Sequence, residues 1–202
     1  MIFRAYEPAI RDHKKCASFL PMATAPQKKS PLPLLLIVVV LAVGCIPCTG
    51  ILAAIAIPSF ISYVKRSKVS EARTNLEVLY LGAASYYEAE RVGPSGDLLT
   101  HCTVGPDVTP NVPSADKQVL PPLGQSFVEL GFMPLDPVYY QYEIVAGPSR
   151  CGVAAGEAVY SFRAHGDLDS DGITSNIELS VGAGEDGRLF RAPGFFIEQE
   201  LE

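Results

Sequence analysis

One stretch, residues 50–90 (GILAAIAIPSFISYVKRSKVSEARTNLEVLYLGAASYYEAE), places the strongest constraint on how this chain can fold. Up to Pro58 the stretch is apolar on every face, which suits a bilayer or a fully buried bundle. Beyond Pro58, apolar residues recur at spacings of three and four, as on one side of an amphipathic helix. These residues are Val69, Ala72, Leu76, Leu79, Ala83 and Tyr86. The pattern predicts one long helix whose second half packs one side against a soluble domain.

The apolar character extends upstream of residue 50. Residues 33–57 contain no charged side chain, and about 24 residues at a rise of 1.5 Å give roughly 36 Å, enough to cross the hydrocarbon core of a membrane. We therefore expect residues 33–57 to form a transmembrane half of the long helix. Basic residues flank this segment on both sides: Lys28 and Lys29 before it, and Lys65, Arg66 and Lys68 after it. The positive-inside rule therefore does not settle its orientation.

Residues 1–32 form a basic N-terminal lead-in without a sustained helical or strand period. Met22 opens a short, Pro-containing segment directly before the apolar run, so translation starts either at Met1 or at Met22. In the second case residues 1–21 would not belong to the protein.

The motif GILAAIAIP, followed by Phe60, a basic cluster and SEARTNL, resembles the N-terminal helix of type IV pilins and of type II secretion pseudopilins. A weaker resemblance continues through VELGFMPLDPVYYQYEIV. The resemblance implies an α+β fold, in which a long N-terminal helix packs on a small antiparallel β-sheet head. It also implies an anchor in the inner membrane and a head, within residues 58–202, in the periplasm or at the cell surface. The implied role is that of a structural, non-enzymatic subunit of a type IV pilus or type II secretion system, which associates with itself or with other pilin-like subunits through the helix.

The sequence departs from the pilin pattern at the expected processing site. Pilins have a cleavage Gly before a Phe-Thr-Leu-Ile-Glu-like start, whereas this chain has Leu36 and Leu41 where the Gly and the Glu should stand. A carboxylate within a membrane is costly unless it pairs with the amine of a neighbouring subunit. Without that Glu, the usual account of register in a filament does not apply. The alternative function is therefore an uncleaved, monomeric, membrane-anchored calcium-binding protein with the pilin fold.

Two further signals lie within the apolar segment. Leu41 to Cys45 resembles a lipoprotein cleavage box, although another apolar run follows Cys45 where mature lipoproteins have a polar tether. Cys45 and Cys48 form a CxxC motif without a nearby His or acidic residue. This composition favours two small, buried hydrophobic side chains over a redox or metal site.

After Glu90 the pattern predicts a long loop and then a small sheet. Gly93 and Pro94 should end the helix, and residues 97–122 are rich in proline without a clear period. Alternating side chains predict strands at 138–145, 158–164, 177–181 and 188–191, with a hairpin turn at 185–187. Residues 127–130 either begin the sheet or form a short helix.

Cys102 and Cys151 are the only cysteines of the predicted head. The periplasm permits a disulfide, which would close a loop of about 50 residues and stabilise the head by roughly 2–4 kcal/mol. We expect this bond rather than two free thiols.

One segment of the head has the spacing of a calcium loop. Residues 167–178 (DLDSDGITSNIE) match D-x-[DN]-x-[DN]-G-x₅-E at every specified position. The predicted ligands are Asp167, Asp169, Asp171, the carbonyl of Ile173, Ser175 and Glu178. This oxygen set favours Ca²⁺, and the flanking patterns indicate a solitary loop between strands rather than an EF-hand. The expected role of the ion is structural, and the simpler alternative is a solvated acidic turn.

Charge and motifs argue against other functions. The net charge is −6, and because residues 1–30 carry about +4, the remainder carries about −10. An acidic head is a poor nucleic-acid binder. No nucleophile elbow, paired-acid motif, P-loop or dinucleotide fingerprint occurs, and the three histidines, His13, His101 and His165, form no motif. We therefore expect neither an enzyme nor a protein with a small-molecule substrate.

Overall fold

The computed structural model describes residues 32–202, which fall into two compact units, the first ending at Thr49 and the second beginning at Gly50. Helix α1 (Leu32–Glu88) contributes to both units. In the first unit, residues 32–49 are helical throughout. The second unit contains the rest of α1 and every strand that the structure describes.

The membrane segment predicted at residues 33–57 is not supported by the structure. Within residues 32–202, no helix is both long enough and apolar enough to cross a membrane. The lead-in with its two candidate starts lies, except for residue 32, outside the described residues. The side chains of Cys45 and Cys48 also lie outside them, so the lipoprotein box and the CxxC motif stay predictions.

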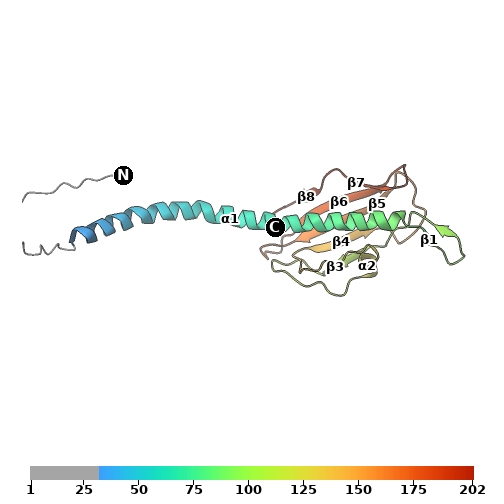
Figure 1. Cartoon of the computed structure of the whole chain (residues 1–202), viewed down its shortest axis with the longest axis horizontal. Coiled ribbons are helices and arrows are strands. Elements are labelled where there is room, and N and C mark those ends of the chain that lie inside the picture. The colour runs from blue at the N-terminus through green and yellow to red at the C-terminus, as the bar shows by residue number, and fades with distance from the viewer. Residues whose placement is uncertain (1–31) are drawn as a thin grey trace, which may run out of the picture. The chain divides into compact units, whose positions relative to one another are not determined.

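The amphipathic half of α1 lies along one face of the sheet (Figure 1). Five of the six predicted stripe residues are buried: Val69, Ala72, Leu76, Leu79 and Ala83. The sixth, Tyr86, is only half-buried, and Tyr87 takes its place with 1% of its surface exposed. Tyr87 stacks on His101, with ring centroids 4.9 Å apart, whereas Tyr86 lies against the guanidinium of Arg91. The prediction missed Tyr87 because spacings of three and four both continue a helical stripe.

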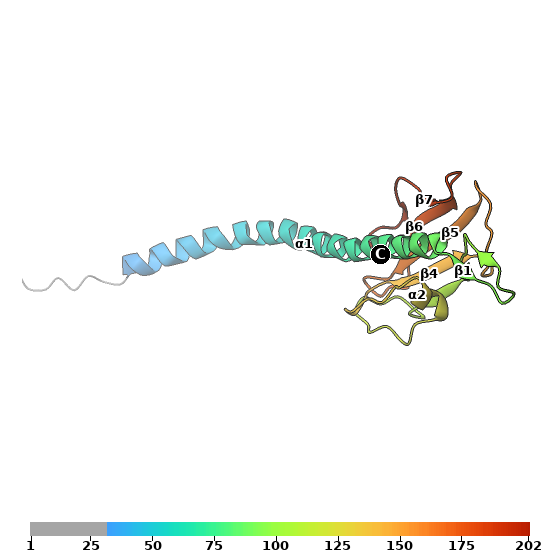
Figure 2. The same cartoon turned by 45° about the vertical axis from the view of Figure 1, so that its right-hand side comes forward.

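The described part of the head contains an antiparallel sheet of six strands. Its order is β3-β4-β5-β6-β7, and β8 also pairs with β6. The strands are β3 (Asp107–Thr109), β4 (Gln141–Ala146), β5 (Ala158–Gly166), β6 (Ser175–Ala183), β7 (Leu189–Arg191) and β8 (Phe196–Glu198). Beyond the end of α1, β1 (Arg91–Val92) and β2 (Leu98–Leu99) form a separate pair. Figure 2 gives a second view, in which α1 again runs along the sheet.

The predicted α+β architecture, a long helix on an antiparallel sheet, is confirmed, and it is compatible with a pilin fold. The predicted alternation is also confirmed, because Tyr140, Tyr142 and Ile144 are buried beneath α1 whereas the intervening residues are half-exposed. On β5, Tyr160 and Phe162 are buried in the same way and stack with ring centroids 5.1 Å apart. The core is therefore largely aromatic.

Strands β1, β2, β3 and β8 were not predicted, whereas the equally short β7 was predicted at 188–191. β3 lies within residues 97–122, which were predicted to be a loop. It pairs with β4 in a register that places Val108 opposite Glu143. β8 lies near the C-terminus and pairs with β6. Strands of three residues are too short to show an alternation, so β3 and β8 are identified by their pairing, whereas β7 was predicted together with the hairpin turn that precedes it. Residues 127–130 form most of a short helix, α2 (Gln125–Glu129), with Phe127 fully buried, which decides between the two predicted alternatives.

The hairpin turn predicted at 185–187 connects β6 to β7. The amide of Gly184 donates to the carbonyl of Arg188 at 2.7 Å, and the Asp186 carboxylate accepts from the Arg188 amide at 3.2 Å. Gly187 has a φ of 76°, a backbone conformation that favours glycine. The turn places β7 beside the last residues of β6.

Candidate functional site

The head leaves many side chains of α1 uncovered. We call the exposed residues of α1 between Gly50 and Ser85 the uncovered surface. Its large hydrophobic members are Ile51, Leu52, Ile55, Ile57, Phe60, Ile61, Tyr63, Val64, Val78 and Leu81. Its other members are small or hydroxylic residues and Pro58, with Arg66 as the one charged residue. A helix face in contact with water normally carries charges, so an apolar surface of this extent is typical of a contact with another molecule.

The basic residues beside Arg66 are bound to the head instead. The Lys65 ammonium lies 2.8 Å from the Asp169 carboxylate, and the Lys68 ammonium donates to the carbonyl of Ala115 at 3.0 Å. Arg66 is the only lysine or arginine among residues 32–202 for which the structure shows no hydrogen bond or ion pair. It is therefore the one basic group that α1 offers to another molecule.

Other charges of α1 also point to the head. Arg73 pairs with Glu200 at 2.6 Å, and Glu77 pairs with Arg191 at 3.1 Å. The carboxylate of Glu71 accepts a hydrogen bond from the amide of Tyr139 at 2.9 Å. Exposed pairs of this kind contribute at most about 1 kcal/mol each. Their positions on both sides of the buried stripe fix the rotation of α1, which determines which residues remain uncovered.

The predicted calcium loop forms the connection between β5 and β6. Carboxylate oxygens of Asp167, Asp169 and Asp171 lie within 4.8 Å of one another. One oxygen of Asp167 accepts from the Gly172 amide at 3.3 Å, whereas the other is buried and has no hydrogen-bond partner in the described part of the chain. The hydrogen bond from Lys65 holds the pKa of Asp169 below its usual value. The three carboxylates thus form a compact anionic cluster against α1.

The structure does not bring all six predicted ligands together. Ile173 lies in the loop, where its amide donates to Asp171 at 2.7 Å. Ser175 begins β6, is fully buried and donates its hydroxyl hydrogen to the carbonyl of Gly166 at 3.4 Å. Glu178 lies further along β6, and its carboxylate is 3.0 Å from Arg163. An extended strand advances about 3.3 Å per residue, so β6 carries Glu178 away from the three aspartates. The assignment of Ser175 and Glu178 as calcium ligands stays a prediction.

Glu178 instead belongs to a ladder of charged residues on the side of the sheet that faces away from α1. Arg163 on β5 lies between Glu178 on β6 and Glu143 on β4, and His165 lies 3.2 Å from Glu143. Burial alone would raise the pKa of Glu178, but hydrogen bonding and the charge of Arg163 lower it below the usual value. Glu178 therefore stays ionised to stabilise the pairing of β5 and β6.

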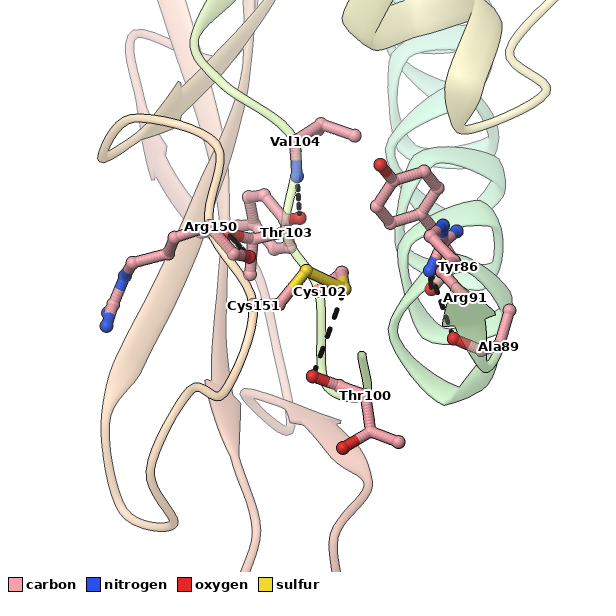
Figure 3. The surroundings of a disulfide bond; sticks show 10 residues. Tyr86, Ala89, Arg91, Thr100, Cys102, Thr103, Val104, Arg150 and Cys151 are labelled. Carbon is pink, nitrogen blue, oxygen red and sulfur yellow. Dashed lines mark hydrogen bonds between the residues drawn. A yellow bond between two sulfur atoms is a disulfide. The ribbon is translucent and has the colours of Figure 1, made fainter. Parts of the chain in front are cut away.

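A disulfide joins Cys102 to Cys151, the pair that the sequence predicts (Figure 3). The same two segments are also connected by hydrogen bonds, because the Thr103 amide donates to the carbonyl of Arg150 at 2.7 Å and the Gly152 amide donates to the carbonyl of Thr100 at 2.9 Å. The bond therefore holds the loop after α1 against the connection between β4 and β5. It lies beside the C-terminal end of α1, where Tyr87 stacks on His101, and no residue of the uncovered surface takes part in it.

Sequence reasoning missed the separate roles of Lys65 and Arg66, which it treated as one basic cluster. The helical period contained the signal. Lys65 precedes buried Val69 by four residues, so both lie on the side that faces the head, whereas Arg66 precedes exposed Ser70 by four residues. The partner of Lys65 had no such signal, because Asp169 lies 104 residues further along the chain.

Comparison with known proteins connects part of this chain to the pilins. A segment of 38 residues is 60% identical to the type IV major pilin protein PilA of Myxococcus xanthus. The segment makes up 19% of this chain and 17% of that relative, so the match spans less than a fifth of either protein. No family model matches the chain. No solved structure matches it either.

Proposed function

We propose that this chain is a structural, pilin-like subunit that packs against other copies of itself, or against related subunits, through the uncovered surface of α1. The observation that carries the proposal is the composition of that surface, which is apolar over many turns of helix and has Arg66 as its one charge. The 38-residue match to a type IV major pilin supports the same role. The corresponding assembly is a type IV pilus or a type II secretion pseudopilus, with the heads in the periplasm or at the cell surface.

The role of Leu81 tests this proposal. Leu81 is 62% exposed on the side of α1 away from the sheet, so Leu81→Glu should leave the head folded and place a charge in the contact between helices. We expect self-association of the purified full-length chain, measured by sedimentation over a range of concentrations, to weaken at least tenfold. A buried, unpaired carboxylate is costly enough to cause a loss of that size.

Leu98→Glu is the matched control, because Leu98 is also 62% exposed but lies on β2 and outside the uncovered surface. Thermal unfolding of all three proteins establishes that the heads are equally folded. A wild-type chain that stays monomeric at every concentration would contradict the proposed assembly, and so would equal weakening by the two substitutions.

The acidic loop supports a second, structural function, the binding of Ca²⁺. The supporting observation is the buried oxygen of Asp167, which lacks a hydrogen-bond partner beside two further carboxylates. A bound calcium ion would neutralise the repulsion among Asp167, Asp169 and Asp171 and take further oxygens from the loop backbone, such as the carbonyl of Ile173. This is also the feature on which the alternative function, a monomeric calcium-binding protein, rests.

Lys65 provides a sharp test of calcium binding, because its ammonium already neutralises Asp169. If Ca²⁺ binds the cluster, it competes with that ammonium, and Lys65→Met should tighten binding several-fold whereas Asp169→Asn should abolish it. The measurement is the thermal midpoint of the full chain at millimolar Ca²⁺ and with chelator, since a ligand of the folded state raises the midpoint. Asp186→Asn, in the exposed turn before β7, is the control for general charge effects. Identical midpoints with Ca²⁺ and chelator in the wild type and in Lys65→Met would mean that the loop is an acidic turn.

A further inference from the structure

One leucine side chain of the head is almost fully exposed to solvent. Leu135, in the connection between α2 and β4, has 99% of its surface exposed, and nearby Met133 has 64% exposed. Pro134 and Pro137 stand on either side of Leu135, and their fixed φ angles stiffen the segment. A stiff segment loses little conformational entropy when it binds. We call residues 133–137 the apolar knob.

An apolar groove lies elsewhere on the same head. Its walls include Val145 on β4, Val159 on β5, Gly182 on β6, and Phe190 and Ala192 at β7. It has a volume of about 470 Å³, within the range of roughly 300–1,000 Å³ found for sites that hold a ligand. The groove opens on the side of the sheet that faces away from α1, because Ser161 and Ser180 also line it and alternate with residues buried under the helix.

Gly182 shapes this groove. A Cβ atom at residue 182 would lie 3.0 Å from the ring of Phe190, so glycine allows that ring to lie close to β6. Even so, 56% of Phe190 is exposed. An aromatic ring held against a strand but left open to solvent is typical of an interaction surface.

The knob and the groove lie toward opposite edges of the sheet. Figures 1 and 2 place α2, which precedes the knob, near β3 at one edge, and β7 at the other edge. One chain therefore cannot insert its own knob into its own groove. We propose that the apolar knob of one copy binds the groove of a second copy, with Leu135 against Phe190.

Charge supports a second copy as the occupant. Asp136, next to Leu135, has no ion-pair partner among residues 32–202. Arg150 lies at the rim of the groove, where it pairs with the groove residue Glu157. Its side chain is about half exposed (48%), so the guanidinium has room for a second carboxylate. Docking of the knob would bring Asp136 to this rim.

A contact between two different surfaces of identical chains is heterologous, and it generates open chains of subunits unless the rotation closes a ring. This inference rests on the proposed function, because the heads can form a series only if the copies assemble. The head contact would specify the register between subunits. In the usual account of pilin filaments a Glu has this role, and this chain has Leu41 at that position.

Photo-crosslinking of the full-length chain tests the contact directly. With a benzoylphenylalanine at residue 135, we expect crosslinked dimers whose crosslinked peptides fall in residues 145–161 or 180–192. The same group at residue 98, an exposed leucine outside both surfaces, should give no such peptides. Crosslinks from residue 135 that map to α1 would overturn the groove as the binding site, and so would the absence of crosslinked dimers. Both outcomes are independent of the effect of Leu81→Glu on self-association, which tests the proposed function separately. A pure monomer carrying a small apolar additive in the groove would identify a ligand site instead and also overturn the proposal.

Mixing two variants tests the heterologous geometry. Leu135→Ser removes the knob and keeps the groove, whereas Ala158→Glu places a charge at the groove and keeps the knob; both residues are exposed, so both variants should fold. In this experiment the photoreactive group replaces Met133 instead of Leu135. Each variant alone should lose at least 80% of the crosslinks between residue 133 and the groove. Their mixture should regain crosslinks only from the Ala158→Glu chain to the Leu135→Ser chain. Crosslinks in both directions would contradict the assigned roles of the two surfaces.

Discussion

Replacing Gly82 by alanine should destabilise the head strongly, although alanine is the better helix former. Within a helix this substitution normally stabilises a protein by about 0.5–1 kcal/mol. At residue 82, however, the new Cβ would lie 2.0 Å from the carbonyl oxygen of Leu130 and 3.0 Å from its carbonyl carbon. Both are backbone atoms, so no side-chain rotation relieves the overlap. α1 must instead move away from the segment that follows α2.

The expected loss is at least about 3 kcal/mol, the upper part of the range for overpacking, because the backbone has to shift. Loss of contact at this point also loosens Phe127 and Phe132, which lie fully buried on either side of Leu130. The measurement is urea unfolding of the full chain, followed by circular dichroism. A loss of this size should appear as a lower midpoint with little change in slope.

Gly50→Ala is the matched control, since Gly50 lies in the same helix and has no atom within 4 Å of its would-be Cβ. Its stability should equal or slightly exceed that of the wild type. If Gly82→Ala were as stable as Gly50→Ala, the close approach of Leu130 to α1 would be wrong, and the rotation of α1 that defines the uncovered surface would be in doubt.

The sequence predicted the parts of this fold that repeat over many residues. Seven of the nine residues of β5 and the five stripe residues from Val69 to Ala83 follow from simple periods, because each period is sampled several times. Gly82 shows the opposite case. Nothing in the sequence distinguishes a glycine against which another backbone packs from a glycine open to solvent, since the contact is made with Leu130, far along the chain.

The candidate sites show the same limit. The spacing of Asp167, Asp169 and Asp171 predicted their proximity, because a loop of five residues holds them together. The spacing did not predict that β6 begins at Ser175 and pairs Glu178 with Arg163, which places Glu178 outside the cluster of the three aspartates. The apolar knob and its groove were not predicted at all, since the exposure of Leu135 and Phe190 depends on the packing of distant segments.

Buried tyrosines should make the head sensitive to alkali. Burial raises the pKa of Tyr140 to about 12 and that of Tyr160 to about 12, and it raises the pKa of Tyr142 as well. In the unfolded chain these hydroxyls ionise near pH 10. A group whose pKa is raised on folding contributes its full stability below the unfolded value, and this stability is lost as the pH rises toward the folded value. We therefore expect stability to be flat up to about pH 10 and to fall steeply between pH 10 and 12.

Tyr140→Phe isolates one of these contributions. The variant keeps the ring that fills the core and removes the ionisable hydroxyl. Between pH 9 and 12 its free energy of unfolding should therefore fall by about 2 kcal/mol less than that of the wild type. Urea unfolding at a series of pH values measures the difference, in which the titration of lysines common to both proteins cancels. Tyr63→Phe is the control, because it removes the same hydroxyl from a tyrosine that is 72% exposed and lies outside the core. Coincident pH profiles for Tyr140→Phe and the wild type would show that alkali reaches the Tyr140 hydroxyl in the folded head, and that the aromatic core under α1 is more open than its burial indicates.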